Sequence, residues 1–522
     1  MPLPNAKYNK GKKGLGRALA GQDHFSSLIF YTASLPSGFS SSQRIKKFFQ
    51  TSDAEAAGIL NDYSDATPAT ATLTLTAAGN TGDKITIAVK DINSTGKLPV
   101  DANGNYTGPT LICSYIKLAS DTTLAILGAS ISAAINIGTL THGYSASFNS
   151  GTEVLTLTAP KKFGSFLNTG APLVVTIVGN IAATIAQFTG GVPSDLAFYH
   201  YQIDRFFTRQ PKGILFVGFF AIPGSYTFSE VNTVQNFSAG SIRQVAVYKD
   251  FSSDFSSSDL TALSLACVVS DNVHKPIQAL YGADMTSISD IGTLTDLSLL
   301  TANKASAIIG MDGNAQGYFL FATSGRSVPA IGAALGTVAL SKVSESIGWV
   351  DEFDMSDGIE YEEIAFANGQ LFSSEAISDN LLDFLNDYRY IFLRKIVGRD
   401  GTFWNGGHTA ISVSSDYAYI EDNRTIDKAI RGNYSDIIGT LNGPLELNDD
   451  GTLSDNTVAI LESKRANLDS MVRAGELSDF DIVVDPNQLV LTTSKLVLTI
   501  ELLQQGVARQ IEVNIGFVPK IA

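Results

Sequence analysis

The sequence predicts a multi-domain protein of the α/β and α+β classes, with a β-rich domain inserted into it. The chain has 522 residues, enough for about three domains at roughly 100–200 residues each. Residues 67–191 are rich in Thr, Ala, Gly, Ile and Val and poor in charge. After Pro193, runs of Val, Ile and Phe alternate with helical segments. That alternation is typical of a parallel or mixed sheet covered on both faces.

The composition excludes several classes of protein. Hydrophobic residues make up 44% of the chain, which is ample for folded cores. No apolar run approaches the ~20 residues of a membrane-spanning helix. Cys113 and Cys267 lie far apart, so neither a disulfide scaffold nor a thiolate zinc site is expected. The net charge of −15 makes direct nucleic-acid binding by the whole surface unfavourable. We expect no cofactor, no metal site and no stable membrane insertion.

Residues 1–22 are predicted to form an extended N-terminal arm. The segment has no apolar periodicity and no apolar stretch of the kind found in a signal peptide. It carries five basic residues and no acidic residue before Asp23; they are Lys7, Lys10, Lys12, Lys13 and Arg17. The segment is either a solvated tail or an arm that becomes ordered on a partner, with nucleic-acid binding as the weakest reading.

Residues 23–66 are expected to begin the core, and residues 67–191 to form an inserted domain on its outer side. A short strand is predicted at 25–32 and a helix in two pieces at 41–50 and 52–60. Within the insertion, period-two alternation predicts strand–turn–strand at 70–91. A helix is predicted at 120–138, a hairpin at 145–160 with its turn at 149–151, and another strand at 172–180.

Residues 192–350 are predicted to form the α/β core. Buried-strand runs occur at 213–220, 242–250, 276–284 and 305–312. Helical segments occur between and after them, at 228–240, 259–275 and 327–348. Short connections between these elements suit right-handed crossovers in a parallel sheet.

Residues 351–522 are predicted to form a C-terminal α+β domain. A helix begins after Ser378, another follows a Gly-rich turn near residue 405, and a third covers 454–476. The chain closes with a predicted hairpin of residues 495–503 and 511–517, which turns at 504–506. Period-two spacing places four apolar residues on one face of its last strand: Ile511, Val513, Ile515 and Phe517.

The search for chemistry yields no catalytic candidate. Neither a phosphate-binding GxxxxGK[ST] loop nor a GxSxG nucleophile elbow is present. Cys267 lies on an apolar stretch and is expected to be a core thiol, and His408 a packed histidine. One acidic stretch is a possible contact face for a basic partner or else a solvated face; it comprises Asp351, Glu352, Asp354, Glu360, Glu362 and Glu363. We therefore expect a protein that is not an enzyme.

The two chain ends are the informative features. An extended arm and an unpaired terminal strand suit β-strand addition between identical subunits. Both groups of end residues, the basic ones of 1–22 and the apolar ones of 511–517, are therefore candidates for strand exchange.

Several segments resemble contractile-tail sheath proteins. They are QRIKKFFQTSDAEAAGIL, HYQIDRFFTRQPKGILFVGF, GRDGTFWNGGHTAI and DYAYIEDNRTIDKAIRGNY, together with the closing hairpin. In this order they cover residues 23–64 and 192–522. The chain is most similar to a sheath-like family of bacterial myophages that was formerly known only as a domain of unknown function. The inserted block resembles a small β-rich module found in phage tail and baseplate proteins.

The resemblance implies a mechanical role in a virion tail. Sheath subunits stack as six-fold rings around a tail tube, exchange terminal strands with their neighbours, and contract to drive the tube through the host envelope for genome delivery. The implied partners are further copies of the chain, the tail tube protein, and baseplate and tail terminator proteins. A sheath of a non-viral contractile injection system is an open alternative. Another virion structural protein and an unrecognised α/β hydrolase are weaker ones.

Overall fold

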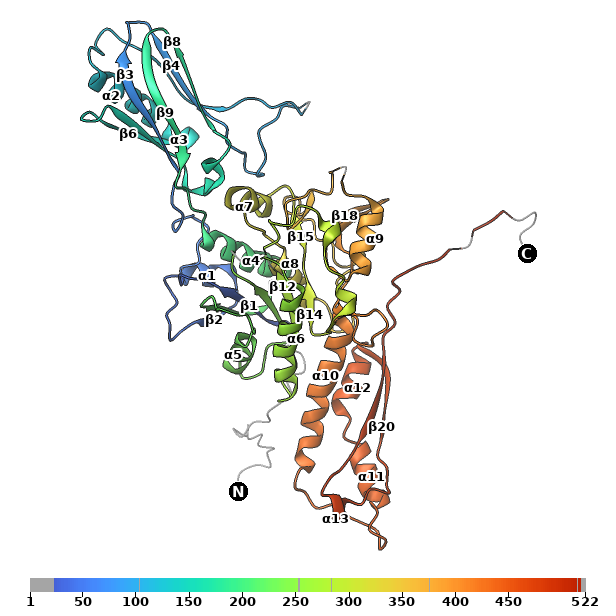
Figure 1. Ribbon diagram of the computed structural model, residues 1–522. Helices are drawn as coiled ribbons and strands as arrows, with labels where there is room; N and C mark the ends of the chain where they lie inside the picture. The colour runs from blue at the N-terminus through green and yellow to red at the C-terminus, as the bar shows by residue number, and fades with distance from the viewer. Residues whose placement is uncertain are drawn as a thin grey trace, which may run out of the picture.

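The computed structural model describes residues 23–102, 104–251, 254–282, 284–374, 376–513 and 515–517. A β-rich unit lies at one end of the molecule, an α/β core in the middle, and a long helical part at the other end (Figure 1). Strands occur in several separate sheets. The predicted mixed α/β architecture with several sheets is confirmed.

A six-stranded sheet in the order β14-β12-β11-β1-β10-β2 forms the centre of the core. Its strands are β1 (Phe25–Tyr31), β2 (Ile45–Phe48), β10 (Ile214–Phe220), β11 (Gln244–Tyr248), β12 (Gln278–Gly282) and β14 (Ala305–Ala307). All neighbours pair in parallel except β2, which pairs antiparallel with β10. The parallel strands are buried on both faces, as their continuous apolar runs predict.

Helices cover both faces of this sheet (Figure 1). On one face lie α1 (Thr51–Ala56), α4 (Asp195–Arg209) and α8 (Ile331–Leu340); on the other lie α5 (Glu230–Phe237) and α6 (Ser257–Asp271). Successive side chains of β1 point to opposite faces of the sheet. Phe30 packs with the first set of helices, and Ile29 packs with the second set. Helices α4 and α8 pack so closely that a Cβ on Gly332 would lie 1.9 Å from the Gln202 carbonyl oxygen.

The helix expected at 41–50 is wrong. Residues 45–48 form the edge strand β2, in which Ile45 and Phe48 are buried against the core. Pairing with β10 satisfies the backbone groups along one edge of this segment, and such tertiary contacts outweigh local helical propensity.

Residues 67–192 fold as two sheets around a core that also includes Phe319 from the main body. Their orders are β6-β7-β3-β9 and β5-β4-β8. The elements are β3 (Thr70–Ala78), β4 (Lys84–Val89), β5 (Thr110–Ile116), α2 (Leu124–Ile137), α3 (Thr139–His142), β6 (Ser145–Asn149), β7 (Val154–Thr158), η1 (Lys161–Phe163), η2 (Phe166–Asn168), β8 (Leu173–Val178) and β9 (Ile181–Thr189). The chain enters and leaves this unit at one point, where Thr67 and Val192 form an antiparallel bridge.

The hairpin expected at 145–160 is confirmed by the antiparallel pairing of β6 with β7. The two strands expected at 70–91 are present, but they do not form a hairpin with each other. β3 and β4 belong to different sheets, so that both contribute apolar side chains to the shared core. The Asp83 carboxylate accepts backbone N–H groups from Asn80 and Asn180, both at 2.7 Å, and thereby joins the two turns that cross between the sheets.

The rest of the chain extends the core and builds the helical part. Around the core lie η3 (Ile291–Thr293), η4 (Leu297–Leu299), β13 (Thr301–Ala302), β15 (Gly310–Asp312), α7 (Gln316–Ser324), β16 (Ile364–Phe366), α9 (Asp379–Asp387), β17 (Leu393–Ile396), β18 (Arg399–Trp404) and β19 (Ala410–Ile411). The helical part contains α10 (Ile420–Ile437), η5 (Ile438–Thr440), α11 (Asp455–Glu462), α12 (Ala466–Arg473), β20 (Leu477–Val483), α13 (Val490–Thr493) and β21 (Thr499–Gln504).

The single helix expected over 454–476 is divided into α11 and α12. The break lets α12 lie against α10, where the Asn467 side chain donates to the Gly432 carbonyl at 3.0 Å. A Cβ on Gly432 would lie 2.6 Å from that of Asn467, so the two helices touch at this glycine.

Buried ion pairs fasten α10 to the core. The Lys304 ammonium lies 2.6 Å from Asp427 and 3.2 Å from Asp271, and Lys304 is 5% exposed. The Lys428 ammonium lies 2.7 Å from Asp23, the first residue that the structure describes. Because breaking a buried pair leaves an unpaired charge away from water, these contacts favour joint movement of the core and α10.

Glu360 is not part of an exposed acidic face. It is 4% exposed, accepts the Tyr201 hydroxyl at 3.0 Å, and accepts the Gln316 backbone N–H at the start of α7, also at 3.0 Å. Asp312 caps the same helix end through the N–H groups of Ala315 and Tyr318. Burial, reinforced by the nearby Asp312 charge, raises the pKa of Glu360 to about 7.

The Glu360→Gln variant is therefore expected to flatten the pH dependence of stability. Between pH 4.5, the ordinary pKa of Glu360, and about 7, the folded chain holds a proton that the unfolded chain has released. Its stability must then fall as the pH rises through this window. Thermal unfolding of the wild type, Glu360→Gln and the exposed control Glu362→Gln between pH 4 and 8 measures the effect. We expect Glu360→Gln to gain about 1–3 kcal/mol over the wild type at pH 8. Equal pH slopes in all three proteins would refute this.

Candidate functional site: an assembly surface

The C-terminal strand residues are exposed and unpaired among the described residues. Ile511, Val513, Ile515 and Phe517 are exposed by 81%, 74%, 94% and 110%. No strand is assigned to residues 505–513 or 515–517, and the described chain extends away from the body toward its end (Figure 1). The expected hairpin between 495–503 and 511–517 is therefore wrong: β21 pairs antiparallel with β20 on one edge, and its other edge has no strand partner among the described residues.

β20 and β21 form a two-stranded sheet beside the end of the chain. Phe480 lies opposite Leu502, and Ile482 lies opposite Ile500. One face packs on α10 and α12 through a small core that includes Leu468. Within the part of the chain that the structure describes, neither outer edge of this sheet pairs with another strand. Both edges are therefore open to strand addition, although the backbone N–H groups of Phe480 and Ile482 donate to the side chains of Asp479 and Asp481, both at 2.9 Å.

Arg509 holds the segment that connects β21 to the exposed strand. Its guanidinium lies 2.7 Å from Glu421 Oε1, and the Glu421 side chain is 3% exposed. The same guanidinium stacks on the Tyr419 ring, with Cζ 3.2 Å from the ring centroid. Both partners lie at the start of α10. Nothing in the sequence marks this site, since an arginine, a tyrosine and a glutamate so far apart in the chain form no recognisable motif.

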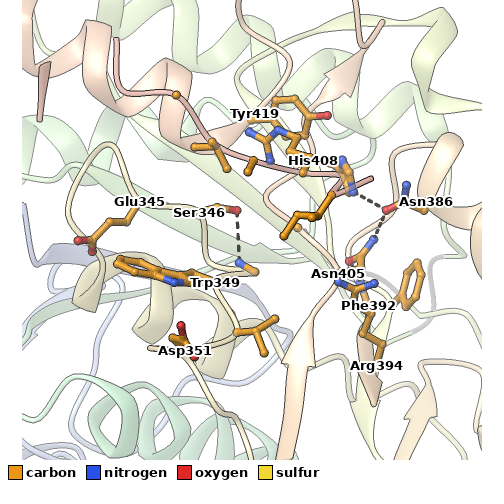
Figure 2. Close-up of a pocket in the computed structure, with 18 of the residues that line it drawn as sticks. Glu345, Ser346, Trp349, Asp351, Asn386, Phe392, Arg394, Asn405, His408 and Tyr419 are labelled. Carbon is orange, nitrogen blue, oxygen red and sulfur yellow. Dashed lines mark hydrogen bonds between the residues drawn. The ribbon is translucent and has the colours of Figure 1, made fainter. Parts of the chain in front are cut away.

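A cleft of about 1220 Å³ lies between this segment and the core. Its walls are residues 342–351, α9, the β17–β18 pair and residues 505–511. Figure 2 shows His408, Asn386 and Asn405 on one side and Trp349, which is 44% exposed, on another. Oppositely charged side chains pair across parts of the wall, such as Arg399 with Asp351 at 2.8 Å. The cleft is therefore mixed in charge and open enough for an extended peptide segment.

His408 is packed, as expected from the sequence. It is 5% exposed, and its Nε2 lies 2.9 Å from Asn386 Oδ1 (Figure 2). Burial, together with the charges of Arg389, Arg509 and Arg394, holds its pKa well below the usual value for histidine. An uncharged imidazole results. Cys267 is buried in the core beside α5, and burial raises the pKa of its thiol, which keeps it protonated.

The other acidic residues of the predicted contact face are not gathered on one surface. Asp354 accepts backbone N–H groups from Thr402 and Ser356, and these hydrogen bonds lower its pKa although burial alone would raise it. Glu363 binds Lys97 of the inserted unit. Asp351 pairs with Arg399, whereas Glu352 and Glu362 are exposed. Only part of the stretch is thus open to a partner.

The basic residues Lys7, Lys10, Lys12, Lys13 and Arg17 lie outside the described residues. Where the described chain begins, Asp23 is bound to Lys428 and Arg431 of α10.

Two further findings concern the kind of site. No helix in the described ranges is both long and apolar enough to cross a lipid bilayer. Among the same residues, no group of three His, Cys, Asp or Glu side chains is placed to hold a metal ion.

Comparison with solved structures finds similar chains in contractile particles. The helical sheath of the anti-feeding prophage in its contracted state has a TM-score of 0.43 and 14% identity, and the match covers 64% of this chain and 84% of that one. A sheath tail protein from Listeria innocua has a TM-score of 0.35 and 9% identity, with 92% and 95% covered. A chain of the contracted anti-feeding prophage baseplate has a TM-score of 0.39 and 12% identity, with 62% and 85% covered.

No curated protein sequence matches this chain. Two models of one family do match it. The model described as the DUF2586 N-terminal domain matches residues 225–408, and that of the DUF2586 C-terminal domain matches residues 416–522. Together, and in this order, they cover more than half of the sequence, and the chain belongs to the DUF2586 family.

Proposed function

We propose that this chain is the structural subunit of a contractile tail sheath. In this proposal it polymerises as stacked six-fold rings around a tail tube and contracts to drive the tube through a host envelope for genome delivery. Its partners are further copies of itself, the tube protein, and baseplate and terminator proteins, all within a virion tail. A sheath of a non-viral injection system would use the same subunit mechanics.

One observation carries the proposal: an exposed terminal segment with apolar residues at alternate positions follows a small sheet that has two free edges. Residues 511–517 and β20 are both seven residues long, about 23 Å at the usual rise of roughly 3.3 Å per residue. The exposed strand of one copy can therefore pair along the whole of β20 or β21 in another copy. Its apolar residues would then extend the face that packs on α10 and α12.

Strand addition suits a machine whose subunits change position. The shared strand keeps its main-chain hydrogen bonds while the two bodies rotate about the linking segments, and leaving such bonds unmade would be costly. The buried ion pairs between α10 and the core favour movement of each body as one piece. The energy for contraction would come from the difference between two sets of subunit interfaces, repeated over many copies.

The remaining candidates have roles in the same assembly. Residues 1–22 are proposed to be the second exchanged arm. The exposed acids among residues 351–363 are available to basic side chains of a neighbour or of the tube. The inserted unit lies at the opposite end of the molecule from β20 and β21 (Figure 1), and we propose that it faces outward.

Charges on the apolar face of the terminal strand are expected to abolish polymerisation. Val513→Asp with Ile515→Asp would bury two carboxylates against α10 and α12 of the acceptor, which is strongly unfavourable. The control, Gln510→Asp with Gly516→Asp, adds the same charge to the opposite face. Sedimentation and electron microscopy should find only monomers in the first variant and near-normal polymers in the control. Ordered tubes from the first variant would contradict strand exchange.

Removal of the inserted unit is expected to leave both folding and polymerisation intact. Thr67 and Val192 exchange two backbone hydrogen bonds, at 3.1 and 2.9 Å, so a short Gly-Ser link can replace residues 68–191. The shortened chain should keep its helical circular dichroism and form tubes of smaller outer diameter. A folded chain that fails to polymerise would show that the insertion belongs to the subunit contacts.

A further inference from the structure

We propose that Arg509 keeps the terminal strand from folding back onto its own sheet. This inference rests on the proposed strand exchange. It assigns to Arg509, Tyr419 and Glu421, called here the arginine clasp, a role in choosing between pairing within one chain and pairing between chains.

The local sequence favours pairing of residues 511–517 with β21 of the same chain. Residues 504–506 are Gln-Gln-Gly, which can form a turn. The apolar residues at alternate positions of 511–517 match those of β21. A third strand would also stabilise the small sheet, since an isolated two-stranded sheet is marginal in water. The local sequence therefore favours a hairpin that the structure does not contain.

The arginine clasp opposes the formation of this hairpin. Arg509 is directed to Glu421 and Tyr419 at the start of α10 rather than along the edge of β21. Its bond to Glu421 is strong, because the carboxylate is almost fully buried and its other oxygen, Oε2, has no hydrogen-bond partner in the described part of the chain. A hairpin would require Arg509 to leave, and Glu421 would then remain buried without its cation.

Tyr419 is the second residue that binds the Arg509 guanidinium. The Arg389 guanidinium lies 4.6 Å from the same ring and donates to the carbonyls of Thr409 and Ala418, which fixes the ring beside Glu421. Among the described residues of the terminal segment, Arg509 is the last that forms an ion pair with the body. The described residues that follow it, 510–513 and 515–517, are all exposed. The terminal segment is thus attached to the body at Arg509, and the described residues beyond it face solvent.

The test is hydrogen–deuterium exchange on dilute, monomeric chains. The wild type should show free-chain exchange over 511–517. In Arg509→Ala the released strand should pair with β21, and exchange of 511–517 should slow by about tenfold or more, as in a formed hairpin. Arg473→Ala, at an exposed arginine of α12, is the control and should match the wild type.

A charge swap keeps the proposal falsifiable. Arg509→Glu combined with Glu421→Arg should restore the ion pair and free-chain exchange, whereas Glu421→Arg alone should slow the exchange. Unchanged free-chain exchange in Arg509→Ala would overturn the clasp, because the strand would then remain open without it.

The two proposals fail separately. If none of these chains polymerises but Arg509→Ala closes its hairpin, the clasp stands and the sheath function falls. If the wild type forms tubes and Arg509→Ala forms them equally well with an open strand, the function stands and the clasp falls.

Discussion

Unpaired backbone at the edge of a sheet is the constraint on which this molecule depends. The β20–β21 sheet offers two free edges, and the chain ends in a strand that has no partner of its own among the described residues. Neither edge thus has a strand partner in a single copy, and four apolar side chains are exposed. In the proposed assembly, the terminal segment of one copy would pair with the sheet of another and bury these side chains. Under this proposal, a neighbouring copy completes the sheet of each subunit.

The β20–β21 sheet is linked to the whole core through α10. The six-stranded sheet is buried between two helical layers, and α10 is fastened to it by ion pairs that include Lys304–Asp427 and Lys428–Asp23. The acceptor sheet in turn packs on α10 and α12. Force applied to an added strand would therefore pass through α10 to the whole core. In the proposed sheath, each subunit would then move as a rigid body while its arm stays bound to a neighbour.

The sequence was informative where burial on both faces or strict alternation determines the element. The runs at 213–220 and 242–250 became central strands, and the hairpin at 145–160 formed as expected. It was less informative where distant parts of the chain compete for one segment. Residues 45–48 became a strand because β10 lies beside them, and β21 found its partner in the distant β20, which local patterning did not predict. Glu360 looked like a surface acid but caps a buried helix end. The contact of Arg509 with Tyr419 and Glu421 depends on the tertiary fold alone.

Electron microscopy of the purified chain tests the central claim most directly. Negatively stained samples would be examined over a range of protein concentrations, with and without added tube protein. The account predicts hollow helical tubes or stacked six-fold rings, at the latest when a tube is present to nucleate them. A uniformly small oligomer at every concentration, even with tube protein added, would contradict it.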